Sequence, residues 1–125
     1  MTHIDSDAFI AWEKGKFNLP AWAEENDEIA FSATAWQQLF FGVLGWEAAR
    51  AAKRRKFLEL VSAPIVDFGR SQAERAASIE AQLKSHTIGF ADCQIAACAI
   101  EDGADLLTFN REHFQRVPGL SLAKP

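Results

Sequence analysis

The stretch Ile88–Leu122, IGFADCQIAACAIEDGADLLTFNREHFQRVPGLSL, gives the clearest indication of how this chain folds. After Gly89, small and apolar residues recur at the spacing of a helix, and Asp92 stands near the start of that pattern. Two acids and Gly103 then end the helix. We therefore expect a buried helix that carries one carboxylate in its first turn.

A short strand follows this helix. Residues 104–108 are mostly apolar and lead into a polar turn at residues 109–111. Open parallel sheets place their binding and catalytic groups at the carboxyl ends of their strands. The sequence therefore predicts that Asp92 lies close to the turn from Thr108 to Glu112.

Strands and helices alternate along the rest of the chain. The expected strands are residues 2–4, 29–32 and 65–68, with 120–122 as a candidate last strand, and the expected helices are residues 8–13, 20–25, 34–44, 46–60 and 71–83. This order predicts an α/β fold with a central, mostly parallel sheet and helices on both faces. A length of 125 residues with 49% hydrophobic content suits one domain, residues 1–125, with a core of its own.

The charge and the hydropathy of the chain exclude several classes of protein. A net charge of −4 argues against a general nucleic-acid coat, because such proteins need overall basic character. A basic run at residues 50–56 is interpreted as a solvated helix face or a local patch. The chain has no apolar stretch of about 18 residues, and its first residues do not resemble a signal peptide. We expect a cytoplasmic protein that does not enter a membrane.

Two carboxylates are expected to converge at one edge of the sheet. Asp5 follows the first strand and Asp92 begins a later helix, so both point toward the crevice at the carboxyl ends of the strands. Carboxylate oxygens suit Mg²⁺ or Mn²⁺, which can activate a water molecule for attack on a phosphodiester. The alternative interpretation is that both residues are only helix caps.

Four blocks of sequence occur in an order that is informative. They are IDSDAFIA at residues 4–11, FSAT at 31–34 followed by LFFGV at 39–43, IGFADCQIAA at 88–97, and LTFNREHF at 107–114 followed by VPGL at 117–120. Together they resemble the PIN-domain family, in particular the VapC-type toxins of bacterial type II toxin–antitoxin pairs. The third block is the most specific of the four.

This resemblance implies a small endoribonuclease that depends on Mg²⁺ or Mn²⁺, cleaves RNA by hydrolysis and is neutralised by a cognate antitoxin. The family's acidic positions fall on Asp5, Gln38, Asp92 and Asn110, which are the implied catalytic residues, and Asp5 and Asp92 are the implied metal ligands. Related toxins are commonly dimers. A homodimer is also expected because the chain is rich in large apolar side chains, namely Trp12, Trp22, Trp36, Trp46, Phe40 and Phe41.

Gln38 departs from the family pattern, which has glutamate at this position. An amide oxygen can bind a metal ion, but it carries no formal charge and cannot accept a proton at neutral pH. The glutamate was replaced deliberately, or the natural protein is attenuated, or Asp7 or Glu112 takes a share of the ligation. Asp7 is otherwise interpreted as a helix cap and Glu112 as a solvated turn residue.

Two alternative functions stay open from the sequence. Gln38 favours a catalytically impaired PIN-fold module that binds RNA or an antitoxin without efficient cleavage. A PIN nuclease of RNA processing that has no antitoxin is the other alternative.

Overall fold

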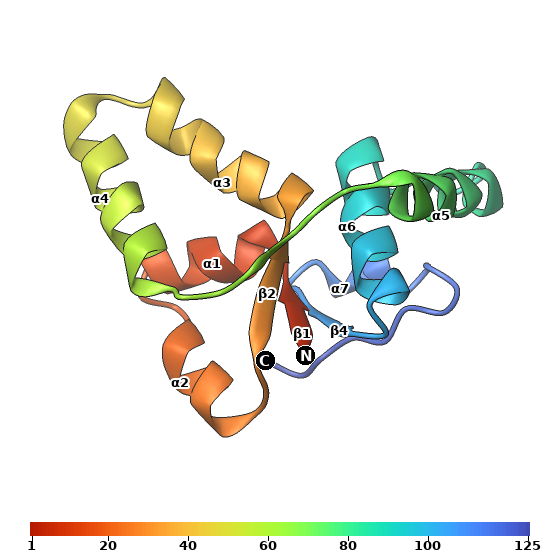
Figure 1. Cartoon of the computed structure of the whole chain (residues 1–125), viewed down its shortest axis with the longest axis horizontal. Helices are drawn as coiled ribbons and strands as arrows, with labels where there is room; N and C mark the ends of the chain where they lie inside the picture. The colour runs from red at the N-terminus through yellow and green to blue at the C-terminus, as the bar shows by residue number, and fades with distance from the viewer.

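A four-stranded parallel sheet forms the centre of the computed structural model, which describes residues 1–125 (Figure 1). Its strands are β1 (Thr2–Ile4), β2 (Ile29–Ser32), β3 (Ile65–Val66) and β4 (Asp105–Leu107), in the spatial order β3-β2-β1-β4. Every pairing is parallel, and Ile4 at the end of β1 lies opposite Leu107 at the end of β4. The residues that follow β1 and β4 are therefore neighbours in space.

Seven helices cover the sheet. They are α1 (Ser6–Glu13), α2 (Leu19–Glu25), α3 (Ala33–Gly45), α4 (Ala48–Leu60), α5 (Arg70–Gln82), α6 (Phe90–Glu101) and α7 (Arg111–Phe114). In Figure 1, α1, α3 and α4 lie to one side of the sheet and α5, α6 and α7 to the other. The predicted α/β architecture with helices on both faces is confirmed. None of the helices combines the length and the apolar character that a membrane span requires.

Several element boundaries differ from the prediction. The third strand is only two residues long, and residues 120–122 contribute a single bridge, from Leu122 to Leu106, in place of a strand. The expected helix at 46–60 begins only at Ala48, because Trp46 takes an extended conformation and separates α3 from α4. The short helix α7 was not predicted, since residues 109–111 were read only as a turn.

The hydrophobic core is one cluster of 23 buried residues. It includes Phe9 from α1, Phe31 from β2, Leu106 from β4 and Phe114 from α7, so elements from both ends of the chain share it. This core fixes the sheet beneath α1, α3 and α6, which carry several of the polar residues described next.

Candidate active site

Asp5 is the residue that links β1 to α1. It has an extended backbone and caps α1, with its Oδ1 accepting a hydrogen bond from the Ser6 amide at 2.8 Å. Its Oδ2 accepts a hydrogen bond from the Thr108 hydroxyl, also at 2.8 Å, and the residue is only 5% exposed. Asp7 was interpreted as a cap of this helix, but Asp5 takes that place because it is the single residue between β1 and α1.

Asp7 ties the turn after β4 to the first turn of α1. Its carboxylate accepts a hydrogen bond from the Phe109 amide at 3.1 Å, and the Thr108 hydroxyl lies 3.2 Å away. Thr108 in turn accepts a hydrogen bond from the Asn110 amide at 3.0 Å. These bonds hold the segment Thr108–Asn110 beside Asp5.

Asp92 stands in the first turn of α6 and is half-buried. Its Oδ2 lies 3.6 Å from Nδ1 of His113 on α7, and the same ring nitrogen lies 2.9 Å from Nδ2 of Asn110. The expectation that Asp92 lies close to the turn after β4 is confirmed.

Gln38 reaches this edge of the sheet from α3. Its Oε1 accepts a hydrogen bond from the Ser6 hydroxyl at 2.9 Å, so its side chain lies over the first residue of α1. Glu112 behaves differently, because it is exposed on α7 and lies 3.7 Å from Arg116. The structure therefore brings Gln38 to the Asp5 junction but gives Glu112 no contact with the other predicted site residues.

The carboxylates are held in a surrounding that disfavours their negative charge. Burial raises the pKa of Asp5 to about 7, and the negative charges of Asp7 and Asp92 add to the effect, while the Thr108 hydrogen bond opposes it. Burial also raises the pKa of Asp92, with Asp7 adding to the rise and His113 opposing it. All three carboxylates thus act on one another, and a cation among them would relieve the repulsion.

The oxygen donors fit a hard cation better than a transition metal such as zinc. No three His, Cys, Asp or Glu side chains gather around one point in the structure. The donors in place are the carboxylates of Asp5 and Asp92 with the amide oxygens of Gln38 and Asn110 at the edge of the group. Such a set with few protein ligands suits Mg²⁺ or Mn²⁺, because these ions keep several of their own waters.

Three further residues complete the site and were not singled out from the sequence. Thr108 and Ser6 form hydrogen bonds with Asp5 and Gln38, and His113 lies beside Asp92. Thr108 had a signal, since it is a polar residue directly after an apolar strand and two residues before Asn110. His113 had none, because its partner lies on another helix.

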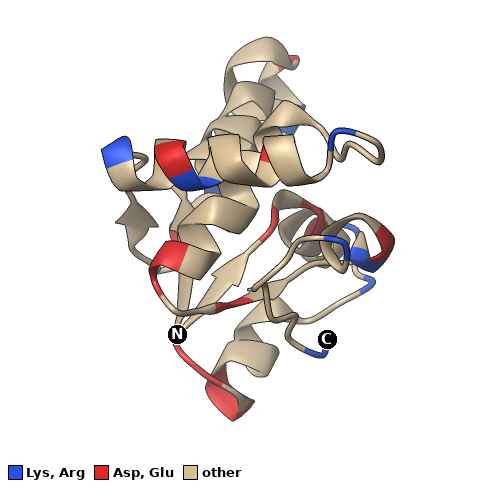
Figure 2. Ribbon diagram, turned by 90° about the vertical axis from the view of Figure 1, so that its right-hand side faces the viewer, with Lys and Arg blue, Asp and Glu red and all other residues tan.

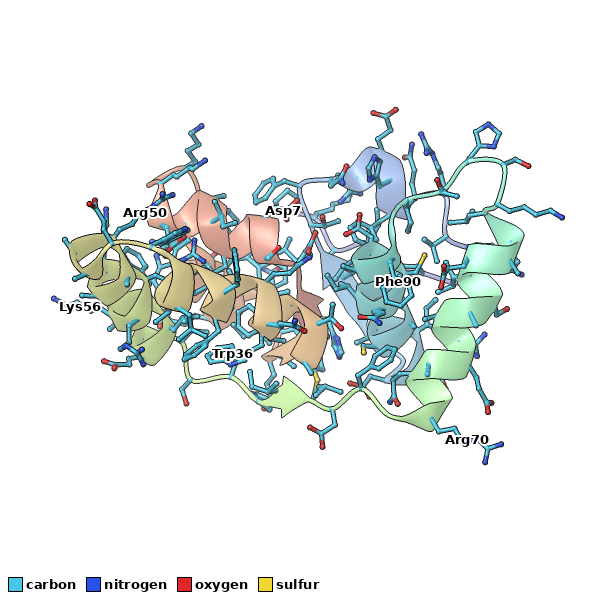
Figure 3. The ribbon with its side chains drawn as sticks, turned by 90° about the horizontal axis from the view of Figure 1, so that it is seen from above. Asp7, Trp36, Arg50, Lys56, Arg70 and Phe90 are labelled. Atoms are coloured by element: carbon cyan, nitrogen blue, oxygen red, sulfur yellow. The ribbon has the colours of Figure 1, made fainter.

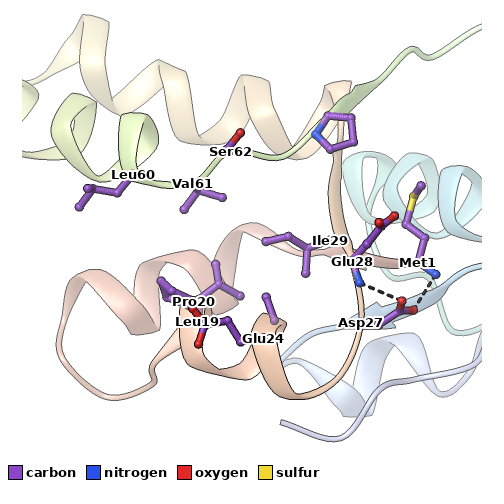
Figure 4. Close-up of a pocket in the computed structure, with 12 residues that line it drawn as sticks. Met1, Leu19, Pro20, Glu24, Asp27, Glu28, Ile29, Leu60, Val61 and Ser62 are labelled. Carbon is purple, nitrogen blue, oxygen red and sulfur yellow. Dashed lines mark hydrogen bonds and ion pairs between the residues drawn. The ribbon is translucent and has the colours of Figure 1, made fainter.

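A hollow of about 680 Å³ adjoins this site. It lies between α3 and the start of α6 and is lined by Thr34, Gln37, Gln38, Phe41, Phe90 and Gln94, among others. A second hollow, of about 550 Å³, is shown in Figure 4 and lies near Met1 and Ile29, at the amino ends of β1 and β2. There Asp27 is already paired with the amino terminus at 2.6 Å. Only the first hollow places free polar groups beside Asp92 and Gln38.

Comparison with known proteins agrees with this geometry. Residues 3–120 match the family model of the PIN domain. The chain is 34% identical to ribonuclease VapC1 of Rickettsia felis and 29% identical to ribonuclease VapC of Rickettsia bellii, in each case over 95% of this chain and 92% of the relative. Its fold is similar to that of a chain in the DNA-bound VapBC structure from Salmonella typhimurium, with a TM-score of 0.84 and 22% identity over 98% of this chain and 96% of that one.

The match of the PIN-domain model to nearly the whole chain and the full-length similarity to VapC ribonucleases confirm the resemblance seen in the sequence. The chain therefore belongs to the PIN-domain family and, within it, to the VapC-type ribonuclease toxins.

Proposed function

We propose that this VapC-type ribonuclease cleaves RNA internally, with Mg²⁺ or Mn²⁺ bound between Asp5 and Asp92. The observation that carries the proposal is the convergence of these two carboxylates, which are buried or half-buried, have raised pKa values and come from elements far apart in the sequence. Like charges held together in this way are typical of cation-binding sites. When bound, the metal would polarise the phosphodiester and activate a water molecule.

Each site residue has a distinct part in this proposal. The Ser6 amide and the Thr108 hydroxyl fix the orientation of Asp5, and His113 lies 3.6 Å from Asp92. Gln38 and Asn110 offer neutral oxygen atoms at the edge of the site, but their amides cannot take up a proton. The proton released by the attacking water would therefore pass to a carboxylate, for which Asp7 and Asp92 are the nearest candidates.

Gln38 supports a second candidate function, a PIN-fold module that binds RNA or an antitoxin and cleaves poorly. With glutamine at this position, the site has one negative charge fewer than the family pattern. Whether that change attenuates the enzyme is decided by the cleavage rate of the protein as it stands.

An antitoxin is the proposed protein partner, and the two would meet in the cytoplasm, where RNA is the target. The similarity of the fold to chains in VapBC complexes supports this proposal. The continuous core cluster supports the proposal that residues 1–125 form a single domain.

A homodimer is also proposed, and of the large apolar residues expected to favour it only Phe41 is strongly exposed. The tryptophans are buried or half-buried, and Trp12 packs edge-on against Phe57 at 4.8 Å between ring centroids. The most exposed large apolar side chains are Leu44 at 73%, Phe41 at 70% and Phe90 at 68%. Phe41 and Phe90 line the hollow beside the site, so a second copy bound there would help to enclose it.

Cleavage of a mixed single-stranded and structured RNA pool in Mn²⁺ tests the proposal. The wild-type protein should produce fragments, while Asp92→Asn should lose at least about 100-fold in rate. Asp105→Asn is the matched control, because this aspartate is exposed at the amino end of β4, away from the site. No cleavage by the wild type, with RNA binding intact, would favour the impaired binding module.

A further inference from the structure

A small basic hollow lies where the end of α1 meets the first turns of α4. Its volume is about 170 Å³, and it is lined by Lys14, Arg50 and Lys53, together with Glu13, Trp46 and Arg54. The established family function assigns nothing to this hollow. Its residues are separate from the Asp5 and Asp92 site.

Charge is unbalanced in this hollow. Glu13 is its one acidic residue, and that carboxylate is bound by the buried Arg54, which is only 4% exposed. Lys14, Arg50 and Lys53 form no ion pair and are all exposed. The hollow therefore presents three uncompensated positive charges.

Some basic residues elsewhere in the molecule are paired with neighbouring acids, and others, such as Arg55 and Lys56, are not. Figure 2 looks onto α5 and α7, where blue and red segments lie close together along the helices. In this part of the molecule Arg70 pairs with Glu74, Arg75 with Glu101, and Arg116 with Glu112. The cations of the hollow differ from these arginines because no acid neutralises them.

Arg50 is also held in place before any ligand binds. Its guanidinium lies 3.7 Å from the centroid of the Trp46 ring, and that of Arg54 lies 4.3 Å from the same centroid. Gly42 makes room for this arrangement, since a Cβ there would come within 2.8 Å of the Trp46 ring. An anchored arginine loses less conformational freedom when it binds a phosphate, and its planar group can form two parallel hydrogen bonds.

The hollow is connected to the proposed catalytic site by α1. Asp5 and Asp7 stand at the start of this helix and Lys14 at its end, and eight residues of helix span about 12 Å. Figure 3 shows α1 running between the labelled Asp7 and Arg50, while Lys56 lies on the outer side of α4. An RNA strand bound at the site would need only a few nucleotides to reach the hollow.

We propose that Lys14, Arg50 and Lys53 bind a backbone phosphate of the RNA substrate, a few nucleotides from the bond that is cleaved. This inference rests on the proposed function. An RNA strand is favoured over an acidic protein segment because the hollow lies one helix length from the cleavage site, so a single strand can occupy both. The contact carries no base specificity and would strengthen binding of any RNA long enough to span both sites.

Binding of a fluorescent 12-nucleotide single-stranded RNA, measured by anisotropy in EDTA across a series of salt concentrations, tests this inference. The variant Arg50→Gln/Lys53→Gln should bind about tenfold more weakly near 0.1 M salt. Its slope of log affinity against log salt should be shallower by about 1.4, the value expected for two lost contacts to a single strand. Unchanged melting temperature would show that both replacements leave the fold intact.

The matched control is Arg55→Gln/Lys56→Gln. It removes the same number of positive charges from α4, but these two residues line a different hollow. It should keep the wild-type slope. An equal loss in both variants, or no loss in either, would overturn the inference. The inference would also be overturned if Arg50→Gln/Lys53→Gln bound the RNA normally but no longer bound a twelve-residue oligoglutamate. The basic hollow would then bind an acidic protein segment.

The binding assay needs no cleavage, so the two proposals fail separately. If the wild type does not cleave RNA but its RNA binding depends on Arg50 and Lys53, the proposed function fails and the basic hollow is still an RNA contact. If the wild type cleaves RNA but Arg50→Gln/Lys53→Gln binds it normally, only the inference about the basic hollow fails. In an active enzyme, Arg50→Gln/Lys53→Gln should raise KM for the 12-nucleotide RNA with little change in kcat. Cleavage of a dinucleotide should not change, because a dinucleotide is too short to reach the basic hollow.

Discussion

Asp5 and Arg54 are both buried ionisable side chains, exposed by 5% and 4%, but their surroundings are opposite. Asp5 faces two further carboxylates, Asp7 and Asp92, and its pKa is raised to about 7. Arg54 binds the carboxylate of Glu13 and donates a hydrogen bond to the Leu39 carbonyl at 3.0 Å. One region thus gathers like charges and the other pairs opposite ones.

This difference separates a structural charge from a functional one. Arg54 joins α1, α3 and α4. Its guanidinium contacts the Glu13 carboxylate, the Leu39 carbonyl and the Trp46 ring, so its partners all lie within the fold. The raised pKa values of Asp5 and Asp92 indicate repulsion among the carboxylates, and such arrangements persist where a ligand or a reaction needs them. The predictions below separate the two kinds of charge.

Breaking the Arg54 pair should have the largest effect on stability. Glu13→Gln leaves a buried, uncompensated guanidinium, which typically costs about 3–5 kcal/mol of unfolding free energy. Urea unfolding measures this loss. The double variant Glu13→Gln/Arg54→Met removes the orphan charge and should recover part of it, and a single variant as stable as the wild type would show that the pair is not structural.

Neutralising Asp5 should have the opposite effect in metal-free protein. Because the pKa of Asp5 is raised from an ordinary 3.8 to about 7, the folded state holds a proton that the unfolded state releases. Stability should therefore fall as pH rises from about 4 to 7, by up to about 4 kcal/mol for this group.

Asp5→Asn removes this dependence, so in EDTA at pH 8 the variant should be more stable than the wild type by about 2–4 kcal/mol. Urea unfolding at pH 5 and at pH 8 gives the comparison. A variant less stable than the wild type at pH 8 would show that Asp5 is mainly a cap of α1.

Restoring a carboxylate at Gln38 should increase activity. Gln38→Glu adds a charge and a proton acceptor beside Ser6, and general-base catalysis alone typically contributes about 10²–10⁴-fold. Since Asp7 and Asp92 already supply carboxylates, we expect a smaller gain, of about 10- to 100-fold in RNA cleavage in Mn²⁺. Equal rates for the two proteins, both above that of Asp92→Asn, would show that glutamine at this position does not limit the enzyme.

The smallest effect is expected at the apolar surface beside the site. Phe41→Gln should weaken self-association by about tenfold, because it removes one exposed aromatic side chain from the proposed dimer surface. Light scattering at micromolar concentration measures the fraction above the 13.9 kDa monomer. A wild-type protein that is entirely monomeric would remove the homodimer from the account.

The sequence indicated the candidate residues more clearly than their contacts. Asp5 and Asp92 were predicted from their places after a strand and at the start of a helix, whereas Gln38 and Asn110 were implied by the resemblance to the family. The partners of these residues depend on how distant segments meet. Thr108 reaches Asp5 because β4 lies beside β1, a pairing that no local pattern reveals. His113 reaches Asp92 because the chain returns from α6 through β4 to α7.

The burial of Arg54 is a second feature that the sequence alone did not predict. As one of five basic residues on α4 it was read as part of a solvated face or a local patch. The fold buries it because Gly42 leaves space beneath Trp46 and because Glu13 arrives from α1. Helical spacing alone cannot distinguish this arginine from Arg50, which stays exposed one turn earlier.

Mn²⁺ binding measured by calorimetry on metal-free protein tests the central claim most directly. The wild type and Asp105→Asn should bind Mn²⁺ with similar affinity, while Asp5→Asn and Asp92→Asn should each lose most of it, because each removes one of the two carboxylate ligands. Undiminished binding in both site variants would contradict the claim that Asp5 and Asp92 form the metal site.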